Sequence, residues 1–250
     1  MGAFNRVLVC GLAALLLSGG QGCGARRQRD VSNEVQPQKP ASLPEVVKFG
    51  NVAAYPRERR IEVEASFCIE EGILEYLGVA ESGKTYESVL QLDCEPSKLH
   101  AALLALGYEP GDVPQEAKGD LIGSESFRTG RQNPKSYLDI FVEWTEGDKS
   151  VRVRAEELLL SIAEDKPAGA THWVFTGSYF ARDTQGQEWY AADLERSIIA
   201  VWYDPSGVIN LPVVTGNPYR GPSGFAVNTE ALPDAPKAKL IILPHVQTAT

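Results

Sequence analysis

The stretch SVLQLDCEPSKLHAALLALG, residues 88–107, decides the fold because it joins a short apolar run to the clearest helix of the chain. The run SVLQLD at 88–93 is typical of a strand. Pro96 stands where its missing N–H costs nothing in a helix, and Gly107 follows the apolar pattern as a left-handed cap would. The apolar residues between them recur at i, i+3, i+4 and i+7: Leu99, Ala102, Leu103 and Leu106. The pattern predicts one principal helix at about 96–106, with a narrow apolar stripe that faces a sheet.

Two further runs on the N-terminal side predict strands that accompany this helix. IEVEASF at 61–67 alternates apolar and polar residues with a period of two, and ILEYLGV at 73–79 follows after Gly72. Short strands separated by glycine-bearing turns are typical of a meander. We therefore expect 61–67, 73–79 and 88–93 to form a three-strand meander in that order.

The segment EGDK at 146–149 predicts the turn of a β-hairpin, because apolar and polar residues alternate on both sides of it. A two-residue turn at Gly147 and Asp148 fixes the register of the two strands. It predicts two cross-strand pairs, Val142 with Val153 and Glu143 with Arg152. The second pair places opposite charges next to each other on the solvent-exposed face.

The rest of the second half is rich in aromatic and β-branched residues, which favours strands. We expect them at 172–181, 187–193, 197–204 and 239–244, the last closing or edging a sheet, and a polar loop at 108–135. The predicted strands contain all four tryptophans: Trp144, Trp173, Trp189 and Trp202. Core or edge packing is their default role, and a shared aromatic ligand face is the alternative. The predicted fold class is α+β, a mostly antiparallel sheet with one principal helix.

The N-terminal residues 1–22 read as an export signal. Arg6 precedes an apolar run at 7–17, which is shorter than the roughly 20 residues that a spanning helix needs. Cleavage before Cys23 would leave an N-terminal cysteine, the residue that carries lipid in bacterial lipoproteins. We expect an exported protein, anchored in the cell envelope and facing the periplasm, whose first partner is the lipid bilayer. Ordinary cleavage with a soluble product is the alternative.

Residues 23–45 have no apolar periodicity and several charges, so they predict a disordered, lipidated tether. The domain is expected at 46–246. The full chain of 250 residues carries a formal net charge of -9. This charge disfavours binding to a nucleic-acid backbone, so we expect no nucleic-acid partner.

The stretch GVAESGKT, from Gly78 to Thr85, satisfies the phosphate-binding pattern G-x-x-x-x-G-K-[ST] letter for letter. A working phosphate loop opens a helix, whose N-terminal amides meet the phosphates. Here the apolar run at 88–93 follows at once and leaves no room for that helix. We expect a glycine-bearing β-turn between two strands, and no bound nucleotide.

Cys68 and Cys94 are the two cysteines left for the exported domain once Cys10 leaves with the signal and Cys23 is lipidated. An oxidising compartment permits them to pair. In a meander of order 1-2-3 the strand ends they follow would lie about 9.6 Å apart, beyond disulfide reach. An order that places the first strand beside the third would bring them together, so a disulfide stays possible.

The segment FCIEEGILEYLGVAESGKTYESVLQLDCEPSKLHAALLALGYEPG (67–111), with HWVFTGSYF at 172–180, resembles the YdjY-domain family of exported bacterial proteins, which includes many planctomycete lipoproteins. The resemblance extends over roughly 46–244 and implies no established reaction. Relatives often have a histidine where this chain has Tyr86, and a cysteine near Ala80. These two departures weaken a metal or redox role for this chain.

The polar positions that match the family are Lys84, Glu87, Ser88 and His100, which we take as candidate binding residues. Glu87, Ser88 and His100 carry the groups of a nucleophile relay, as in a hydrolase. The alternative is a boundary histidine hydrogen-bonded to a turn, with no G-x-S-x-G elbow to expose the serine. His172 and His245 stand alone in the sequence. No set of ligands at metal spacing is present, so we expect neither a metal nor a cofactor.

Together these patterns predict an envelope lipoprotein that binds a small ligand or an envelope protein, or assembles with one, without catalytic turnover. The alternative is a hydrolase that works through Ser88, His100 and Glu87.

Overall fold

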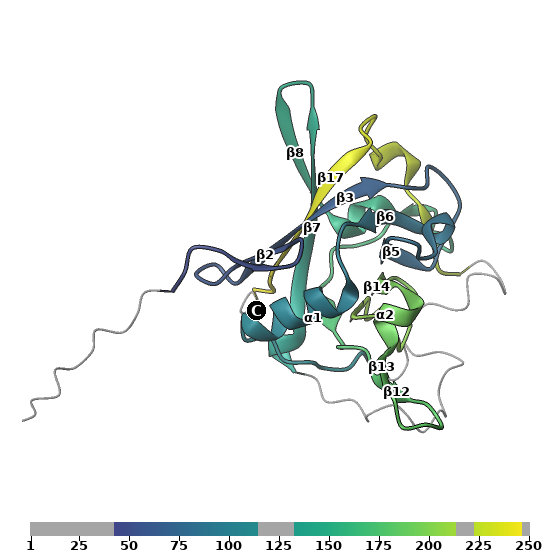
Figure 1. Cartoon of the computed structure of the whole chain (residues 1–250). Helices are drawn as coiled ribbons and strands as arrows, with labels where there is room; N and C mark the ends of the chain where they lie inside the picture. Colours follow the sequence, from purple (N-terminus) through teal and green to yellow (C-terminus); the bar gives the residue numbers. More distant parts are fainter. Residues whose placement is uncertain (1–42, 115–132, 214–222, 247–250) are drawn as a thin grey trace, which may run out of the picture. The chain divides into compact units, whose positions relative to one another are not determined.

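The structure, a computed structural model, describes residues 43–114, 133–213 and 223–246 (Figure 1). The predicted signal peptide, Cys23 and the predicted tether up to residue 42 lie outside the described residues, as does most of the predicted loop at 108–135. Among the described helices, none has the length and apolar character needed to cross a membrane.

A closed barrel of eight strands forms the centre of the domain. Around the ring the strands are β3 (Arg60–Phe67), β17 (Lys237–Pro244), β7 (Tyr137–Glu146), β11 (Trp173–Phe175), β15 (Ile209–Asn210), β14 (Ser197–Ala200), β5 (Tyr76–Ala80) and β6 (Ser88–Leu92). The ring closes because β3 pairs with β17 on one side and with β6 on the other. Two neighbouring pairs, β14 with β15 and β5 with β6, are parallel. The predicted antiparallel sheet is therefore a mixed barrel, and α+β holds as the coarser description.

Smaller strands surround the barrel. Strands β1 (Val47–Phe49) and β2 (Val52–Tyr55) extend the sheet from β3, and β8 (Lys149–Arg154) extends it from β7. A second sheet has the order β10 (Lys166–Pro167), β9 (Leu159–Ser161), β16 (Phe225–Val227) and β4 (Ile73–Leu74). The hairpin of β12 (Phe180–Arg182) and β13 (Glu188–Tyr190) stands apart, and Figure 1 shows it beside the short helix α2 (Ala191–Glu195).

The predicted helix is present as α1 (Pro96–Ala105), and it contacts β1, β2 and α2. Its C-terminus is a Schellman motif, in which Gly107 N–H donates to Leu104 O and Tyr108 N–H donates to Leu103 O. Gly107 has φ +78°, the left-handed conformation predicted for it. The predicted apolar stripe is buried: Leu99, Ala102, Leu103 and Leu106 all belong to the main core.

The predicted hairpin is confirmed in its register. Val142 lies opposite Val153, and Glu143 lies opposite Arg152. The Arg152 and Glu143 side chains form an ion pair at 2.7 Å. Gly147 turns the chain with φ +58°. Strand β17 lies between β3 and β7, so the predicted last strand does close the sheet.

The predicted three-strand meander is wrong. Strand β6 lies between β3 and β5, and the run at 73–79 divides into β4 of the second sheet and β5 of the barrel. All five residues of β5 are buried. A strand that is buried on both faces has a continuous apolar sequence, whereas a meander strand with one solvent-exposed face alternates apolar and polar residues. Strands buried on both faces are also typical of parallel pairing.

The predicted strand at 187–193 is wrong in its second half. The residues Ala191–Glu195 form α2, and Arg196 ends this helix in the left-handed conformation with φ 58°. The sequence AADLE contains good helix formers, so local propensity favours the helix once β13 has ended. Trp144 and Trp173 are buried in the core, whereas Trp189 is exposed on the hairpin. The tryptophans therefore do not share one ligand face.

Candidate functional site

Lys84 and Glu87 lie at the return between β5 and β6, where Lys84 forms an ion pair with Glu75. The distance from Lys84 Nζ to Glu75 Oε2 is 2.9 Å, and the ammonium lies 5.5 Å from the centre of the Tyr76 ring. Desolvation acts to lower the pKa of Lys84, but the hydrogen bond and the charge of Glu75 raise it overall. This lysine is thus held as a charged partner of the protein's own carboxylates, in a contact that ties the return to the barrel.

Ser88 is fully buried, and its Oγ donates a hydrogen bond to Leu90 O at 2.9 Å. A serine nucleophile needs an exposed hydroxyl with a base within hydrogen-bond reach. His100 instead lies on α1, with its Nδ1 2.6 Å from Tyr190 Oη and its ring edge-on to Phe175. The structure therefore does not assemble the predicted relay of Glu87, Ser88 and His100.

His100 is a boundary histidine held by an aromatic neighbour. The Tyr190 hydroxyl also lies 3.1 Å from Gly177 O, in a turn where Gly177 has φ +81°. Burial lowers the pKa of His100. The neutral imidazole is the form that this half-buried position favours.

The phosphate-loop pattern forms a turn, as predicted. Gly83 N–H donates to Ala80 O, a single 3₁₀ turn follows at Thr85–Glu87, and β6 begins at Ser88. A Cβ at Gly83 would lie 2.9 Å from the Val79 Cβ and 3.0 Å from the Ala80 oxygen. Close packing of this turn therefore explains the glycine.

Cys68 and Cys94 are free thiols in the structure. Strand β3 does lie beside β6, the order that a disulfide needs, but the two run antiparallel with Phe67 opposite Leu90. The two cysteines follow these strands at opposite ends, so they are kept apart. Burial raises the pKa of Cys68 to about 11 and that of Cys94 to about 12. Neither thiol is therefore activated as a nucleophile.

His172 and His245, which look isolated in the sequence, lie together. Their ring centres are 5.2 Å apart, and His245 Nδ1 lies 3.0 Å from Asp139 Oδ1. Burial and the charge of His245 lower the pKa of His172, which Asp139 partly opposes. Asp139 links this pair to a polar network beneath β8.

Arg154, the last residue of β8, is the centre of that network. Its Nη2 donates to Asp139 Oδ1 at 2.9 Å, to Glu156 Oε1 at 3.0 Å and to Thr171 O at 2.7 Å. Thr171 N–H donates to the same Glu156 oxygen at 3.2 Å. Desolvation acts to raise the pKa of Asp139, but hydrogen bonds from His245 and Arg154 lower it below its ordinary value. One guanidinium therefore serves two carboxylates.

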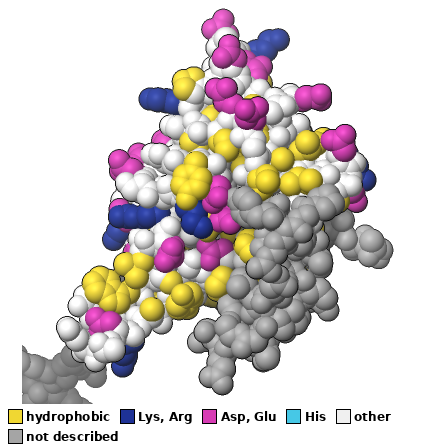
Figure 2. Space-filling view, turned by 90° about the vertical axis from the view of Figure 1, so that its right-hand side faces the viewer, with side chains coloured by type: hydrophobic (Ala, Val, Ile, Leu, Met, Phe, Trp, Pro, Cys, Tyr) yellow, Lys and Arg dark blue, Asp and Glu magenta, His cyan; other side chains and the backbone are white. Residues whose placement is uncertain are grey.

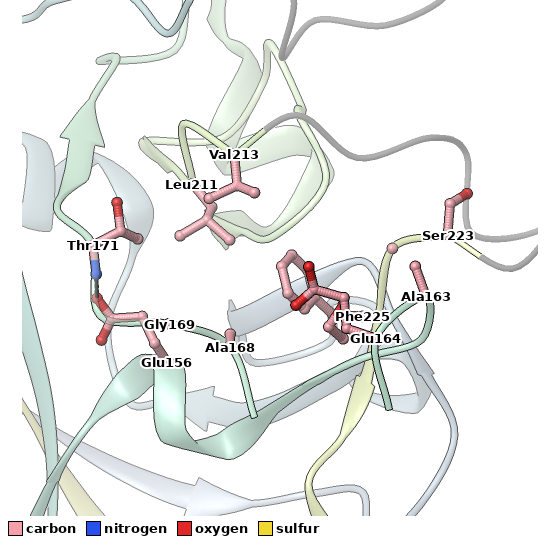
Figure 3. A pocket seen from close by; sticks show the side chains of 12 residues that line it. Glu156, Ala163, Glu164, Ala168, Gly169, Thr171, Leu211, Val213, Ser223 and Phe225 are labelled. Carbon is pink, nitrogen blue, oxygen red and sulfur yellow. Dashed lines mark hydrogen bonds between the residues drawn. The ribbon is translucent and has the colours of Figure 1, made fainter. Parts of the chain in front are cut away.

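Glu156 borders a cavity of about 270 Å³ between the second sheet and the segment that follows β15 (Figure 3). Its side chain is 1% exposed, and its Oε2 atom has no hydrogen-bond partner. Figure 3 shows Glu156 and Thr171 on one side of the cavity, Phe225 and Glu164 on the other, and Leu211 and Val213 across from Ala168. A buried polar atom that lacks a partner is rare in native proteins. This oxygen is itself buried, so it lies behind the cavity wall and does not open onto the cavity.

A larger hollow of about 720 Å³ lies near Cys94, and two pairs of the polar side chains that line it bind each other. Arg196 Nη1 is 2.7 Å from Glu95 Oε2, and Asn51 Nδ2 donates to Asp93 Oδ1 at 3.0 Å. Within the described part of the chain, the buried side-chain atoms without a partner belong to Arg154, Glu156 and Trp173, none of which lines this hollow. The cavity at Glu156 is therefore the better candidate site.

Glu156 carries no signal in the sequence that marks it as a site residue. It follows a hairpin strand in the run RAEELLL, where its neighbour Glu157 is exposed. The predicted hairpin register places Arg154 opposite Phe141. The local sequence, however, does not show that Glu156 is buried and Glu157 is exposed. Among the described residues, no group of three or more His, Cys, Asp or Glu side chains is placed to hold a metal ion.

Comparison with known families gives one match. The model of the YdjY domain matches residues 57–243, about three quarters of the chain. The chain belongs to the YdjY domain family. The part that matches the YdjY domain contains every described residue that lines the cavity at Glu156. No curated protein and no solved structure gave a significant match.

Proposed function

We propose that this YdjY-domain protein is an exported, lipid-anchored binding module that takes a small ligand in the cavity at Glu156, without catalytic turnover. One observation carries the proposal. A cavity of about 270 Å³ is lined by apolar side chains together with a few polar ones, among them the buried Glu156. Ligand sites are typically apolar hollows with a few well-placed polar groups, which is the composition of this cavity.

The position of Ser88 favours binding over hydrolysis. Its hydroxyl is buried and donates to a backbone carbonyl, so a substrate cannot reach it. His100 is engaged by Tyr190 and cannot serve as its base without a rearrangement. No other observation favours the hydrolase.

The charge of the surface fits a partner other than nucleic acid. The chain carries a formal net charge of -9, and Figure 2 shows acidic and basic side chains interspersed, with no continuous basic area among the described residues of that face. A nucleic-acid surface needs a clustered basic patch to release counterions. A small ligand in a cavity has no such requirement.

Ligand binding is tested by amide chemical shifts of the full chain during titration with a mixed set of small neutral, anionic and cationic fragments. We expect at least some fragments to shift the amides of Gly169 and Thr171. Ala168→Leu adds three carbon atoms at the cavity and is expected to abolish these shifts. Ala181→Leu, on the separate hairpin, makes the same change elsewhere and should leave them intact. If no fragment shifts the cavity amides, or if Ala168→Leu binds as well as the parent, the proposed site is wrong.

The anchor is tested at Cys23. The cysteine follows a short apolar run with small residues before the cleavage point, which supports lipidation. We expect the parent chain to incorporate a labelled fatty acid and to fractionate with membranes, and we expect Cys23→Ser to lose both properties. If the fragments still shift the amides of Gly169 and Thr171 in Cys23→Ser, the domain of this variant is folded. A parent chain that takes up no label would contradict the anchor and leave the cavity proposal standing.

A further inference from the structure

We propose that His172 and His245 bind a divalent transition-metal ion of the zinc and copper class on the outer face of the barrel. No ligand set at metal spacing can be read along the chain, because these two histidines come from distant segments. The inference does not depend on the proposed cavity ligand. It follows from the strand register, from the spacing of the two rings and from the carboxylate that orients one of them.

Strand register brings the two histidines to one face of the sheet. Strand β7 lies between β11 and β17 and pairs with both. Continued by one residue, the register with β11 places His172 opposite Asp139. The register with β17 places His245 opposite Tyr137, whose backbone oxygen accepts the His245 N–H at 3.1 Å. Tyr137 and Asp139 alternate with Leu138, which is buried in the core, so all four side chains lie on the outer face of β7.

The spacing of the rings is the one that a shared metal ion requires. The ring centres of His172 and His245 are 5.2 Å apart. A zinc–nitrogen bond is about 2.0–2.1 Å long and the ring centre lies about 1.2 Å beyond the nitrogen, which puts two ring centres about 4.5–5.2 Å apart at bond angles of about 90–110°. The Tyr137 ring packs 4.2 Å from that of His172 and restrains it. The two imidazoles therefore already have the separation of a metal-bound pair.

Asp139 orients His245 as a carboxylate does in many metal sites. His245 Nδ1 lies 3.0 Å from Asp139 Oδ1, which also accepts from Arg154. These hydrogen bonds hold the pKa of Asp139 below its ordinary value, so the carboxylate accepts the Nδ1–H. Nε2 is then the nitrogen left for an ion, which displaces a proton from it if one is bound. Metal-ligating histidines commonly donate their other ring N–H to such a partner.

The position and the ligand type favour a weakly held transition metal. An ion can reach the pair from solvent, because 26% of the His245 side chain is exposed and His172 is only partly buried. Imidazole nitrogen suits zinc, copper and nickel, whereas magnesium and calcium prefer oxygen ligands. Two protein ligands are fewer than the four of a structural zinc site, so water completes the coordination. We expect reversible binding, tighter for Cu²⁺ than for Zn²⁺.

The test is a Zn²⁺ titration of the full chain, followed by the imidazole Cε1–H signals in NMR spectra. The chain contains three histidines, so His100, which is engaged by Tyr190, is an internal control. We expect the signals of His172 and His245 to shift together and to saturate, and that of His100 to stay in place. Mg²⁺ at the same concentrations should shift none of them. An equal response of His100, or no saturable shift of the pair, would overturn the proposal.

His172→Gln and His245→Gln each leave one imidazole of the pair. We expect either change to weaken Zn²⁺ binding at the remaining histidine about tenfold or more, because two joined ligands hold an ion far more tightly than one. His100→Gln is the matched control and should alter the affinity by less than about twofold. The amide spectra show whether each variant is folded. Unchanged affinity in either variant of the pair would mean that the ion binds elsewhere. That result would leave the cavity proposal standing, since neither histidine lines the cavity.

Discussion

Replacement of Arg154 with methionine is expected to lower the free energy of unfolding by about 3–5 kcal/mol, because it leaves two carboxylates without their cation. Glu156 is 1% exposed and Asp139 has 15% of its side chain exposed, so water cannot replace the guanidinium at the first of them. The Arg154 side chain also donates to Thr171 O, which would lose its partner as well. Urea denaturation of the full chain measures the effect.

Arg152→Met is the matched control, two residues earlier on the same face of β8. Its side chain is 47% exposed and pairs with Glu143 at the surface, so we expect a loss below about 1 kcal/mol. The double variant Arg154→Met with Glu156→Gln should recover part of the Arg154→Met loss, since one of the stranded charges is removed. Equal destabilisation by Arg152→Met and Arg154→Met would refute the buried network.

The local elements of this fold could be predicted from the sequence because their signals are local. Pro96 and Gly107 mark the ends of α1, and the turn at Gly147 fixes which residues of β7 and β8 face each other. Each of these features depends on residues within one helix or one hairpin. The confirmed register of Val142 with Val153 shows how far such a signal reaches.

The closure of the barrel could not be predicted in the same way. It depends on β3 pairing with both β17 and β6, and β17 lies about 180 residues further along the chain. The parallel pair of β5 and β6 is joined by a short return at residues 81–87, where a longer crossover is usual. The sequence does contain one clue, since YLGVA in β5 is apolar throughout and does not alternate as a meander strand should.

The candidate site was missed for a related reason. Three of the four polar residues that match the family lie in sequence at 84–88, and the structure uses Lys84 and Ser88 within the protein's own contacts. Glu156, Asp139 and Thr171 come from separate segments, which only the closed barrel and the second sheet bring together. A site built from distant residues has no spacing that can be read along the chain.

Trp173→Ala is expected to cost about 3–5 kcal/mol of unfolding free energy, which is the range for removal of a buried aromatic side chain. Trp173 is fully buried on β11, opposite Leu138 of β7, and it belongs to the main core. Trp189→Ala, on the exposed hairpin, should cost less than about 1 kcal/mol and serves as the comparison. Thermal or urea unfolding of the parent chain, Trp173→Ala and Trp189→Ala measures the two losses of stability.

Trp173→Phe distinguishes packing from hydrogen bonding at the same position. The indole Nε1–H is buried and has no partner, so its loss removes a donor that costs about 1–3 kcal/mol when unsatisfied. The smaller ring leaves a cavity that costs free energy in the opposite direction. Because the two effects oppose each other, we expect Trp173→Phe to change stability by less than about 1.5 kcal/mol. A loss as large as that of Trp173→Ala would mean that Nε1 has a partner in solution, such as a buried water, and that the ring is held by this bond as well as by the core.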